Sequence, residues 1–221
     1  MVKLENVSFK YSDKDVILKD ASIDFSRNKT TILLGKNGVG KTTLLSLIDG
    51  FLVNDGGVIK KDSESVYIYD NPQLYEYITG EEYIDLIKSI GNQKNKKDIM
   101  PLVKSLELGE SLNKIISSYS LGMKHKLALL TAIMLDYELY LIDEPLAALD
   151  PDSQKFMINF FKNMKINNKT LIISTHMINV AYEMADEIII FKNHKLKKFK
   201  NNFSTYEEFN EFVVKLIRED E

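Results

Sequence analysis

A loop rich in glycine and followed by lysine and threonine carries the clearest chemistry of this sequence. Residues 35–42 read Gly-Lys-Asn-Gly-Val-Gly-Lys-Thr and fit G-x-x-x-x-G-K-[ST], the pattern of a P-loop that binds the phosphates of a nucleotide. Glycines let the backbone turn so that several N–H groups face an anion, and the start of a helix adds a positive dipole end. In this pattern Lys41 reaches the β- and γ-phosphates, and the Thr42 hydroxyl binds Mg²⁺.

Two acidic residues and one histidine follow apolar segments further along the chain. Asp143 and Glu144 end one such segment, and His176 follows another. In parallel sheets, ligands lie beyond the carboxyl ends of the strands. There Asp143 can hold Mg²⁺ through water, Glu144 can polarise an attacking water, and His176 can hydrogen-bond a phosphate. On its own the acidic pair is better explained as a helix cap and the histidine as structural, but a P-loop in the same chain favours catalysis.

The segments on either side of the P-loop have the character that the pattern needs. Residues 30–34 are β-branched and apolar and predict a buried strand. Residues 41–49 carry apolar side chains at helical spacing, and Gly50 is placed to end that helix. An ordinary glycine-rich turn is the alternative interpretation. A strand before the loop and a helix after it favour the phosphate site.

The first 25 residues predict an antiparallel β layer that leads into the nucleotide core. Apolar residues recur along 2–11, and two shorter apolar runs at 16–18 and 21–25 are separated by polar residues, which predicts three strands. Tyr11 stands at the end of the first strand, just before a polar loop. Its ring can stack on an adenine, and packing on its own sheet is an equal alternative.

A helical insertion is expected between residues 79 and 118. Thr79-Gly80-Glu81-Glu82 is a capping box, and the residues after it predict a helix that ends at Gly91. The polar, basic stretch 92–97 is interpreted as a solvated link rather than a nucleic-acid patch, and Asp98 is expected to cap a second helix. The predicted apolar face of the first helix consists of Tyr83, Ile84, Ile87 and Ile90.

The second half of the chain alternates helices with apolar strands, which predicts a largely parallel sheet. The expected strands are 139–142, 170–173 and 187–191, and the expected helices are 120–135, 152–164 and 178–184. Ser204-Thr205-Tyr206-Glu207 is a second capping box, and the apolar face of the helix that follows is expected to dock on the body of the protein.

The predicted fold class is therefore α/β: a P-loop NTPase with a mostly parallel sheet core, an N-terminal antiparallel β layer and an inserted helical subdomain. The expected units are an ATP-binding core at 1–78 and 119–200, a helical subdomain at 79–118 and a C-terminal amphipathic helix at 201–221.

Composition narrows the classes of function. The chain has 221 residues, 44% of them hydrophobic, and a net charge of −3, so no bulk attraction to nucleic acid or anionic lipid is expected. Cysteine is absent, which fits a reducing compartment. No apolar run approaches the roughly 20 residues of a membrane helix, and the first residues lack the apolar core of a signal peptide. We therefore expect a cytoplasmic protein whose membrane role, if it has one, needs a partner.

Five motifs in order resemble those of the ATP-binding subunits of ABC transporters, over essentially the whole chain. The P-loop comes first. The segment 139–144 resembles the Walker B strand, and Tyr119-Ser120-Leu121-Gly122-Met123 stands where the family has its LSGGQ signature. Ala148-Leu149-Asp150 matches the D-loop, and His176 matches the switch histidine.

This resemblance implies that two such subunits meet head to tail around ATP and Mg²⁺, as a homodimer or a heterodimer. Ser120 and the Gly122 amide would then contact the γ-phosphate bound to the partner. The resemblance favours adenine stacking by Tyr11 and makes Lys41, Glu144 and His176 the expected catalytic residues. The remaining expected nucleotide contacts are Gly35, Asn37, Gly38, Val39, Gly40, Thr42, Thr43 and Asp150.

Three departures from the family pattern are visible. Leu121 and Met123 replace a glycine and the glutamine of the signature, a variant similar to that of bacterial multidrug, bacitracin and lantibiotic exporters. Asp70 occupies the position of the Q-loop glutamine, where it could touch Mg²⁺ or its water, and Gln73 three residues later is the alternative. Asn193-His194 replaces the glycine usual in a late turn.

The resemblance implies an integral membrane transporter subunit as partner, no nucleic-acid partner, and a place on the inner face of the cell membrane. That partner would dock on the Q-loop region and the helical insertion. Two alternatives are a soluble ABC ATPase and a nucleotide-sensing subunit with little turnover. The single P-loop and the lack of a heptad run disfavour the first, and the altered signature allows the second.

Overall fold

Six strands form the sheet that carries the P-loop in the computed structural model, which describes residues 1–90, 99–147 and 149–218. Their order is β5-β6-β7-β3-β8-β9. Neighbours from β5 to β8 pair in parallel, and β9 pairs antiparallel with β8. The strands are β3 (Thr30–Leu34), β5 (Ser65–Ile68), β6 (Leu139–Asp143), β7 (Thr170–Thr175), β8 (Glu187–Lys192) and β9 (Lys195–Lys200).

A second sheet forms the antiparallel layer, in the order β2-β1-β4, from β1 (Val2–Ser12), β2 (Asp15–Phe25) and β4 (Gly56–Lys61). The prediction of two strands at 16–18 and 21–25 is wrong, because β2 runs unbroken through both. The pairing with β1 shifts register between Leu18 and Ala21, and Asp20 takes a positive φ of 48° there. Its N–H donates to the Ser8 hydroxyl at 2.9 Å, so a bulge absorbs the polar residues that suggested a turn.

Alternating side chains on the central strands face two different cores. On β6, Leu139 and Leu141 pack with α1 (Lys41–Asp49) and the antiparallel layer. Tyr140 and Ile142 point to the other face and pack with the helices there. These helices are α4 (Leu121–Met134), α5 (Pro151–Ile166) and α6 (Ile178–Met184). The main sheet is therefore covered on both faces, which explains why its strands are continuously apolar.

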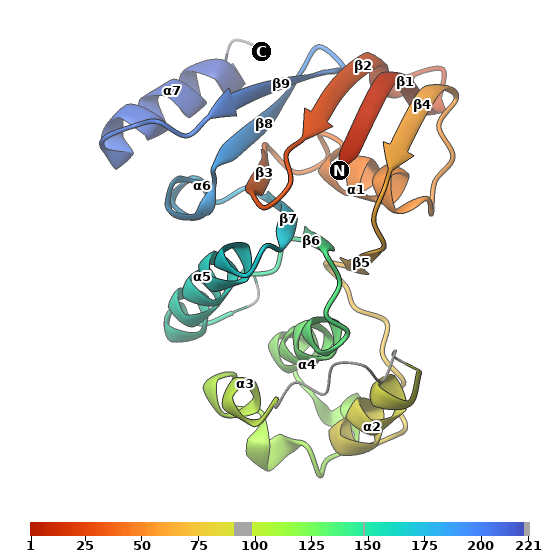
Figure 1. Cartoon of the computed structure of the whole chain (residues 1–221), viewed down its shortest axis with the longest axis vertical. Helices are drawn as coiled ribbons and strands as arrows, with labels where there is room; N and C mark the ends of the chain where they lie inside the picture. Colours follow the sequence, from red (N-terminus) through yellow and green to blue (C-terminus); the bar gives the residue numbers. More distant parts are fainter. Residues whose placement is uncertain (91–98, 148, 219–221) are drawn as a thin grey trace.

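The helical region lies at the end of the molecule opposite the antiparallel layer (Figure 1). It contains α2 (Gly80–Ile90), α3 (Met100–Ser105) and two short turns at Gly109–Ser111 and Ile116–Ser118. Thr79 and Glu82 form the predicted capping box: the Thr79 N–H donates to Glu82 at 2.7 Å, and the Glu82 N–H donates to the Thr79 hydroxyl at 3.2 Å. Of the predicted apolar face, Tyr83 and Ile84 are buried and Ile87 is partly buried, whereas Ile90 at the end of the helix is 72% exposed.

Several predictions fall outside the described residues: the helix end at Gly91, the link at 92–97, the cap at Asp98 and the Ala148 of the D-loop. The expected long helix over 120–135 is α4, with Ser120 as its N-cap. It packs on α2 as well as on β5, so it joins the helical region to the sheet.

The C-terminal helix α7 (Tyr206–Arg218) packs on the body, as predicted. Phe209 and Val213 are fully buried in the same core as α6. The capping contacts differ by one residue from those expected, since the Glu208 N–H donates to the Thr205 hydroxyl and the Ser204 N–H donates to the Glu208 carboxylate, both at 3.3 Å. In the described part of the chain, no helix is long and apolar enough to span a membrane.

Strand β9 was not predicted. Its sequence, Lys-Leu-Lys-Lys-Phe-Lys, is too polar to be recognised as a core strand. Asn193 and His194 join it to β8, and both have positive φ, 50° and 60°. Two such residues make the tight turn that suits a β-hairpin, and here the turn joins β8 to β9.

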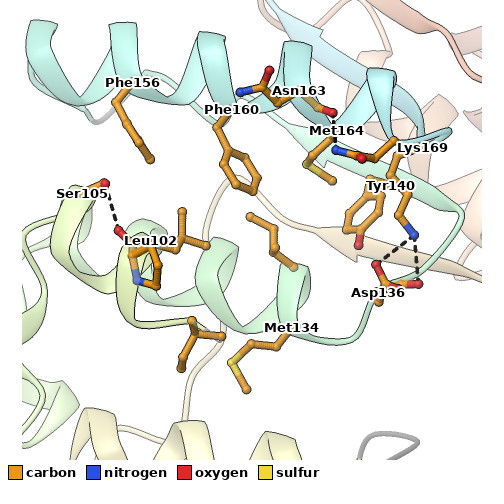
Figure 2. Close-up of a pocket in the computed structure, with 14 residues that line it drawn as sticks. Leu102, Ser105, Met134, Asp136, Tyr140, Phe156, Phe160, Asn163, Met164 and Lys169 are labelled. Carbon is orange, nitrogen blue, oxygen red and sulfur yellow. Dashed lines mark hydrogen bonds and ion pairs between the residues drawn. The ribbon is translucent and has the colours of Figure 1, made fainter. Parts of the chain in front are cut away.

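A hollow of about 390 Å³ lies between α3, the end of α4 and α5. Figure 2 shows Phe156 and Phe160 of α5 pointing into it. At one end Lys169 Nζ pairs with Asp136 Oδ1 at 2.9 Å. Tyr140, near the amino end of β6, also lines the hollow. The hollow therefore lies towards the amino ends of the strands, whereas the P-loop follows the carboxyl end of β3.

Candidate nucleotide-binding site

The P-loop leaves β3 and enters α1 in a conformation that requires glycine. Gly38 and Gly40 have φ of 81° and 108°. A Cβ on Gly40 would lie 2.5 Å from Cγ2 of Ile17 and 3.3 Å from the ring of Phe191. Side chains of β2 in the antiparallel layer and of β8 therefore lie close against Gly40 and leave no room for a larger residue. No side chain caps the start of α1, so its first N–H groups stay open to an anion.

Lys41 is 6% exposed and lies inside this loop. Its Nζ donates to the backbone carbonyls of Gly35 at 2.8 Å and Lys36 at 3.2 Å, and lies 3.4 Å from Glu144 Oε1. The loop thus fixes a cation beside the uncapped start of α1, and a cation there suits a bound polyphosphate.

Thr42 and Asp143 bring two distant segments together. The Thr42 hydroxyl donates to Asp143 Oδ2 at 2.6 Å, and the Ser174 hydroxyl donates to Asp143 Oδ1. Asp143 is 2% exposed; burial raises its pKa, and the hydrogen bonds from Ser174 and Thr42 oppose that rise. A hydroxyl and a carboxylate are the hard oxygen ligands that Mg²⁺ takes together with phosphate oxygens, so these two residues fit the ion.

Glu144 is turned out of the strand direction towards the pocket. It has a φ of 46°, and its N–H donates to the hydroxyl of Ser174 at 3.0 Å. Its Oε2 lies 3.1 Å from His176 Nδ1, whereas its buried Oε1 accepts no hydrogen bond from the described residues. A left-handed φ in a non-glycine residue stores strain and is typical of functional sites. Its Oε1 faces Lys41 Nζ at 3.4 Å, so the carboxylate lies between the P-loop lysine and His176.

Lys41, Thr42, Glu144 and His176 line one pocket of about 460 Å³, to which Tyr11 and Asp70 also contribute. The Tyr11 hydroxyl lies 3.1 Å from the Thr43 hydroxyl, and its ring packs edge-on against Phe9 while remaining 58% exposed. Both alternatives for Tyr11 thus persist: one edge packs on the sheet, and the rest is open at the pocket. Gln73 donates to the Asn71 carbonyl at 3.4 Å and does not line the pocket, so the geometry favours Asp70 over Gln73.

The signature and D-loop residues lie elsewhere. Ser120 caps α4, and its hydroxyl accepts from the Met123 N–H at 3.2 Å; neither it nor Gly122 lines the pocket. Asp150 caps α5, and hydrogen bonds from Ser153 hold the pKa of Asp150 well below its usual range. Ser120, Gly122 and Asp150 therefore do not line the P-loop pocket of their own chain.

Ser174 was missed as a site residue. Its hydroxyl bonds Asp143 and its position also anchors Glu144, so it orients both acids. The signal was present in the sequence: a polar residue at the end of a buried strand, two positions before His176.

Comparison with known proteins agrees with this geometry. The family model described as ABC transporter matches residues 18–147. The SkfA peptide export ATP-binding protein SkfE of Bacillus subtilis is 28% identical over 235 residues, covering 99% of this chain and 98% of its own. The bacitracin transport ATP-binding protein BcrA of Enterococcus faecalis is 28% identical over 212 residues, covering 90% of this chain and 68% of its own.

Solved structures confirm the fold. The structure titled ATP binding subunit of ABC transporter superposes with a TM-score of 0.84 at 23% identity, covering 97% of this chain and 99% of its own. The cassette MJ0796, a dimer in a post-hydrolysis state bound to ADP and Pi, gives 0.80 at 21% identity, covering 92% and 100%. The predicted α/β cassette fold is confirmed, and the chain belongs to the ABC transporter family as an ATP-binding subunit with ATPase activity.

Proposed function

We propose that this chain binds ATP with Mg²⁺ at the P-loop pocket and hydrolyses it to power export through a separate membrane subunit. The P-loop amides of Gly35, Asn37, Gly38, Val39 and Gly40, with Lys41 and Thr43, hold the phosphates. Thr42 and Asp143 hold Mg²⁺, with Asp70 beside them. The observation that carries this proposal is the convergence of Lys41, Thr42, Asp143 and Glu144 from segments about a hundred residues apart in sequence.

Hydrolysis on this proposal depends on Glu144 and His176. Glu144 polarises the water that attacks the γ-phosphoryl group and accepts its proton, and ADP leaves as the bond to the β-phosphate breaks. His176 holds the Glu144 carboxylate through the 3.1 Å contact and faces the γ-phosphate. Mg²⁺ supplies charge stabilisation at the phosphate oxygens when bound.

A second ATPase subunit completes the site. Ser120 is exposed at the N-terminus of a 14-residue helix but lies away from its own pocket, so a partner's nucleotide is its proposed ligand. Asp150 faces the same partner. MJ0796 is dimeric in its post-hydrolysis structure, which supports this arrangement.

A membrane transporter subunit is the proposed partner outside the dimer, and it would hold the chain on the inner face of the membrane. Between β5 and α2, Tyr75 and Tyr77 are 66% and 92% exposed. The Tyr75 ring lies 6.3 Å from that of Tyr83 on α2, so these exposed aromatic side chains border the helical region. Exposed aromatic side chains are suited to docking a partner helix. Export as the direction of transport is supported by the names of SkfE, a peptide export protein, and BcrA, a bacitracin transport protein.

Two assays test the proposal. The purified chain should hydrolyse ATP only with Mg²⁺, and Asp143→Asn should lose that activity while Asp85→Asn, on an exposed face of α2, should keep it. Normal Mg²⁺-dependent turnover by Asp143→Asn would refute the metal assignment. Tyr77→Asp should release the chain from membranes that contain its transporter subunit and leave the ATPase rate of the isolated chain unchanged. Undiminished membrane attachment would refute the docking surface.

A further inference from the structure

The nucleotide pocket is lined by residues from two different layers of the protein. One group, which includes Glu144 and His176, follows strands of the main sheet. A second group consists of Tyr11, Asp15 and Ile17, which belong to β1 and β2 of the antiparallel layer. On the proposed function the first group surrounds the γ-phosphate. The ribose and the base of the nucleotide therefore extend towards the second group.

The second group is held against the P-loop and α1 by close contacts. The Tyr11 hydroxyl lies 3.1 Å from the Thr43 hydroxyl. A Cβ on Gly40 would lie only 2.5 Å from Cγ2 of Ile17, so the Ile17 side chain lies directly beside the P-loop. An aromatic ring and an apolar side chain thus border the pocket next to the place where the phosphates bind.

Asp15 adds a carboxylate to these walls. It is paired with Ser12 of β1 across a two-residue turn, so its backbone is fixed near Tyr11. Its carboxylate lines the pocket and has no hydrogen bond or ion pair with any residue that the structure describes. Asp13, in the turn itself, differs on both counts, because it pairs with Lys10 and does not line the pocket. The Asp15 oxygens are therefore available to a ligand.

The charge of Asp15 restricts which part of a nucleotide it suits. A carboxylate repels phosphate groups, because like charges repel. The nucleoside is uncharged and offers neutral donors, which are the 2′- and 3′-hydroxyls of the ribose and the 6-amino group of adenine. An ionised carboxylate has only acceptor oxygens, so these donors are the groups that it can bind. A hydrogen bond to an ionised acceptor is also stronger than one between neutral groups.

We propose that Asp15 is a specificity-determining residue, whose carboxylate accepts a hydrogen bond from the nucleoside of bound ATP beside the Tyr11 ring. The donor is a ribose hydroxyl or the 6-amino group of adenine, which present the same chemistry to the carboxylate. The chain thereby selects a complete nucleotide over a bare triphosphate. This inference rests on the proposed nucleotide site.

Equilibrium binding in EDTA tests the proposal on the full chain without hydrolysis. The proteins are the wild type, Asp15→Ala and the matched control Asp13→Ala, which removes the same charge from the same hairpin but outside the pocket. The ligands are ATP, inorganic triphosphate and three analogues that each lack one donor. These analogues are 2′-deoxy-ATP, 3′-deoxy-ATP and purine riboside triphosphate.

Asp15→Ala should weaken ATP binding by about three- to tenfold, the scale of one hydrogen bond. It should leave triphosphate binding unchanged or make it tighter, since a negative charge is lost. Asp13→Ala should bind both ligands within about twofold of the wild type. The wild type should bind one analogue more weakly than ATP by the same factor, and Asp15→Ala should bind that analogue and ATP equally. That analogue identifies the donor.

The proposal is overturned if Asp15→Ala binds ATP as tightly as the wild type or more tightly, the result expected for a merely solvated charge. Equal losses for ATP and triphosphate, or the same loss in Asp13→Ala, would also overturn it. So would a wild type that binds all three analogues as tightly as ATP, or an Asp15→Ala protein that still discriminates against the weaker one. A wild-type chain that binds neither ATP nor triphosphate would instead refute the proposed nucleotide site.

Discussion

Lys41 Nζ lies 3.4 Å from Glu144 Oε1, so the P-loop lysine and the proposed base face each other across the pocket. Both side chains are largely buried, with side-chain exposures of 6% and 12%. On the proposed function, an incoming γ-phosphate would compete with Glu144 for this lysine. Phosphate binding would then free Glu144 to orient water, which would link nucleotide binding to activation of the base.

The first prediction concerns Lys41. Lys41→Met should weaken ATP binding by about 10- to 150-fold, because charge-assisted hydrogen bonds contribute roughly 1.5–3 kcal/mol. Equilibrium binding with EDTA measures this without hydrolysis. Lys60→Met, which removes an exposed lysine of β4, is the control and should bind normally. Wild-type affinity in Lys41→Met would mean that the lysine does not reach the phosphates.

Variants of Tyr11 can distinguish stacking on adenine from packing on the sheet. Tyr11→Ala should weaken ATP binding by roughly 5- to 150-fold, since stacking on an aromatic ring contributes about 1–3 kcal/mol. Tyr11→Phe loses only the contact with Thr43 and should stay within about twofold of the wild type. Inorganic triphosphate, which has no base, should bind all three proteins equally. If Tyr11→Ala weakened triphosphate binding as much as ATP binding, Tyr11 would act through the sheet and not through adenine.

The third prediction tests the contact between the two layers at Gly40. Gly40→Ala should lower the free energy of unfolding by about 1–3 kcal/mol from its positive φ alone, and by more from the overlap with Ile17. Gly38 also has a positive φ, but a Cβ there would meet open space. Gly38→Ala should therefore show only the cost of the backbone conformation. Chemical denaturation of both variants, and of Gly40→Ala with Ile17→Ala, separates the two causes. Equal losses for Gly40→Ala and Gly38→Ala would contradict a clash with Ile17.

Glu187 gives the fold a pH dependence. It is 3% exposed; burial alone would raise its pKa, but hydrogen bonds from Lys29 and Ser26 and the charge of Lys198 hold the pKa below its ordinary value of 4.5. A carboxyl with a lowered folded pKa stabilises the fold above its unfolded pKa and loses that effect as pH falls through the folded value.

Glu187→Gln should therefore lower the free energy of unfolding by about 2 kcal/mol at pH 7, the scale of a charge-assisted hydrogen bond. The difference from the wild type should stay constant down to about pH 5 and shrink below it. Urea denaturation from pH 7 to pH 3 measures this, with exposed Glu64→Gln as the control. A difference that does not shrink at low pH would show that the loss of packing, and not of charge, is responsible.

Much of the fold and the core of the site could be predicted because their signals are local. The P-loop, the strands that end at Asp143 and before His176, and the capping box at Thr79 each lie within a few residues of sequence. Their convergence follows from one rule, that parallel strands present their carboxyl ends at one edge.

The features that were missed depend on contacts between distant segments. Strand β2 stays continuous because Ser8, on another strand, satisfies the Asp20 N–H. Strand β9 is polar and forms because β8 pairs with it.

Glu144→Gln offers the most direct test of the account, because it preserves the size of the side chain and removes the base. ATP turnover should fall by about a hundredfold or more, the scale of general-base catalysis, while Mg²⁺-ATP still drives the chain into a dimer seen by sedimentation. The same variant hydrolysing ATP at the wild-type rate would contradict the central claim that Glu144 activates the attacking water.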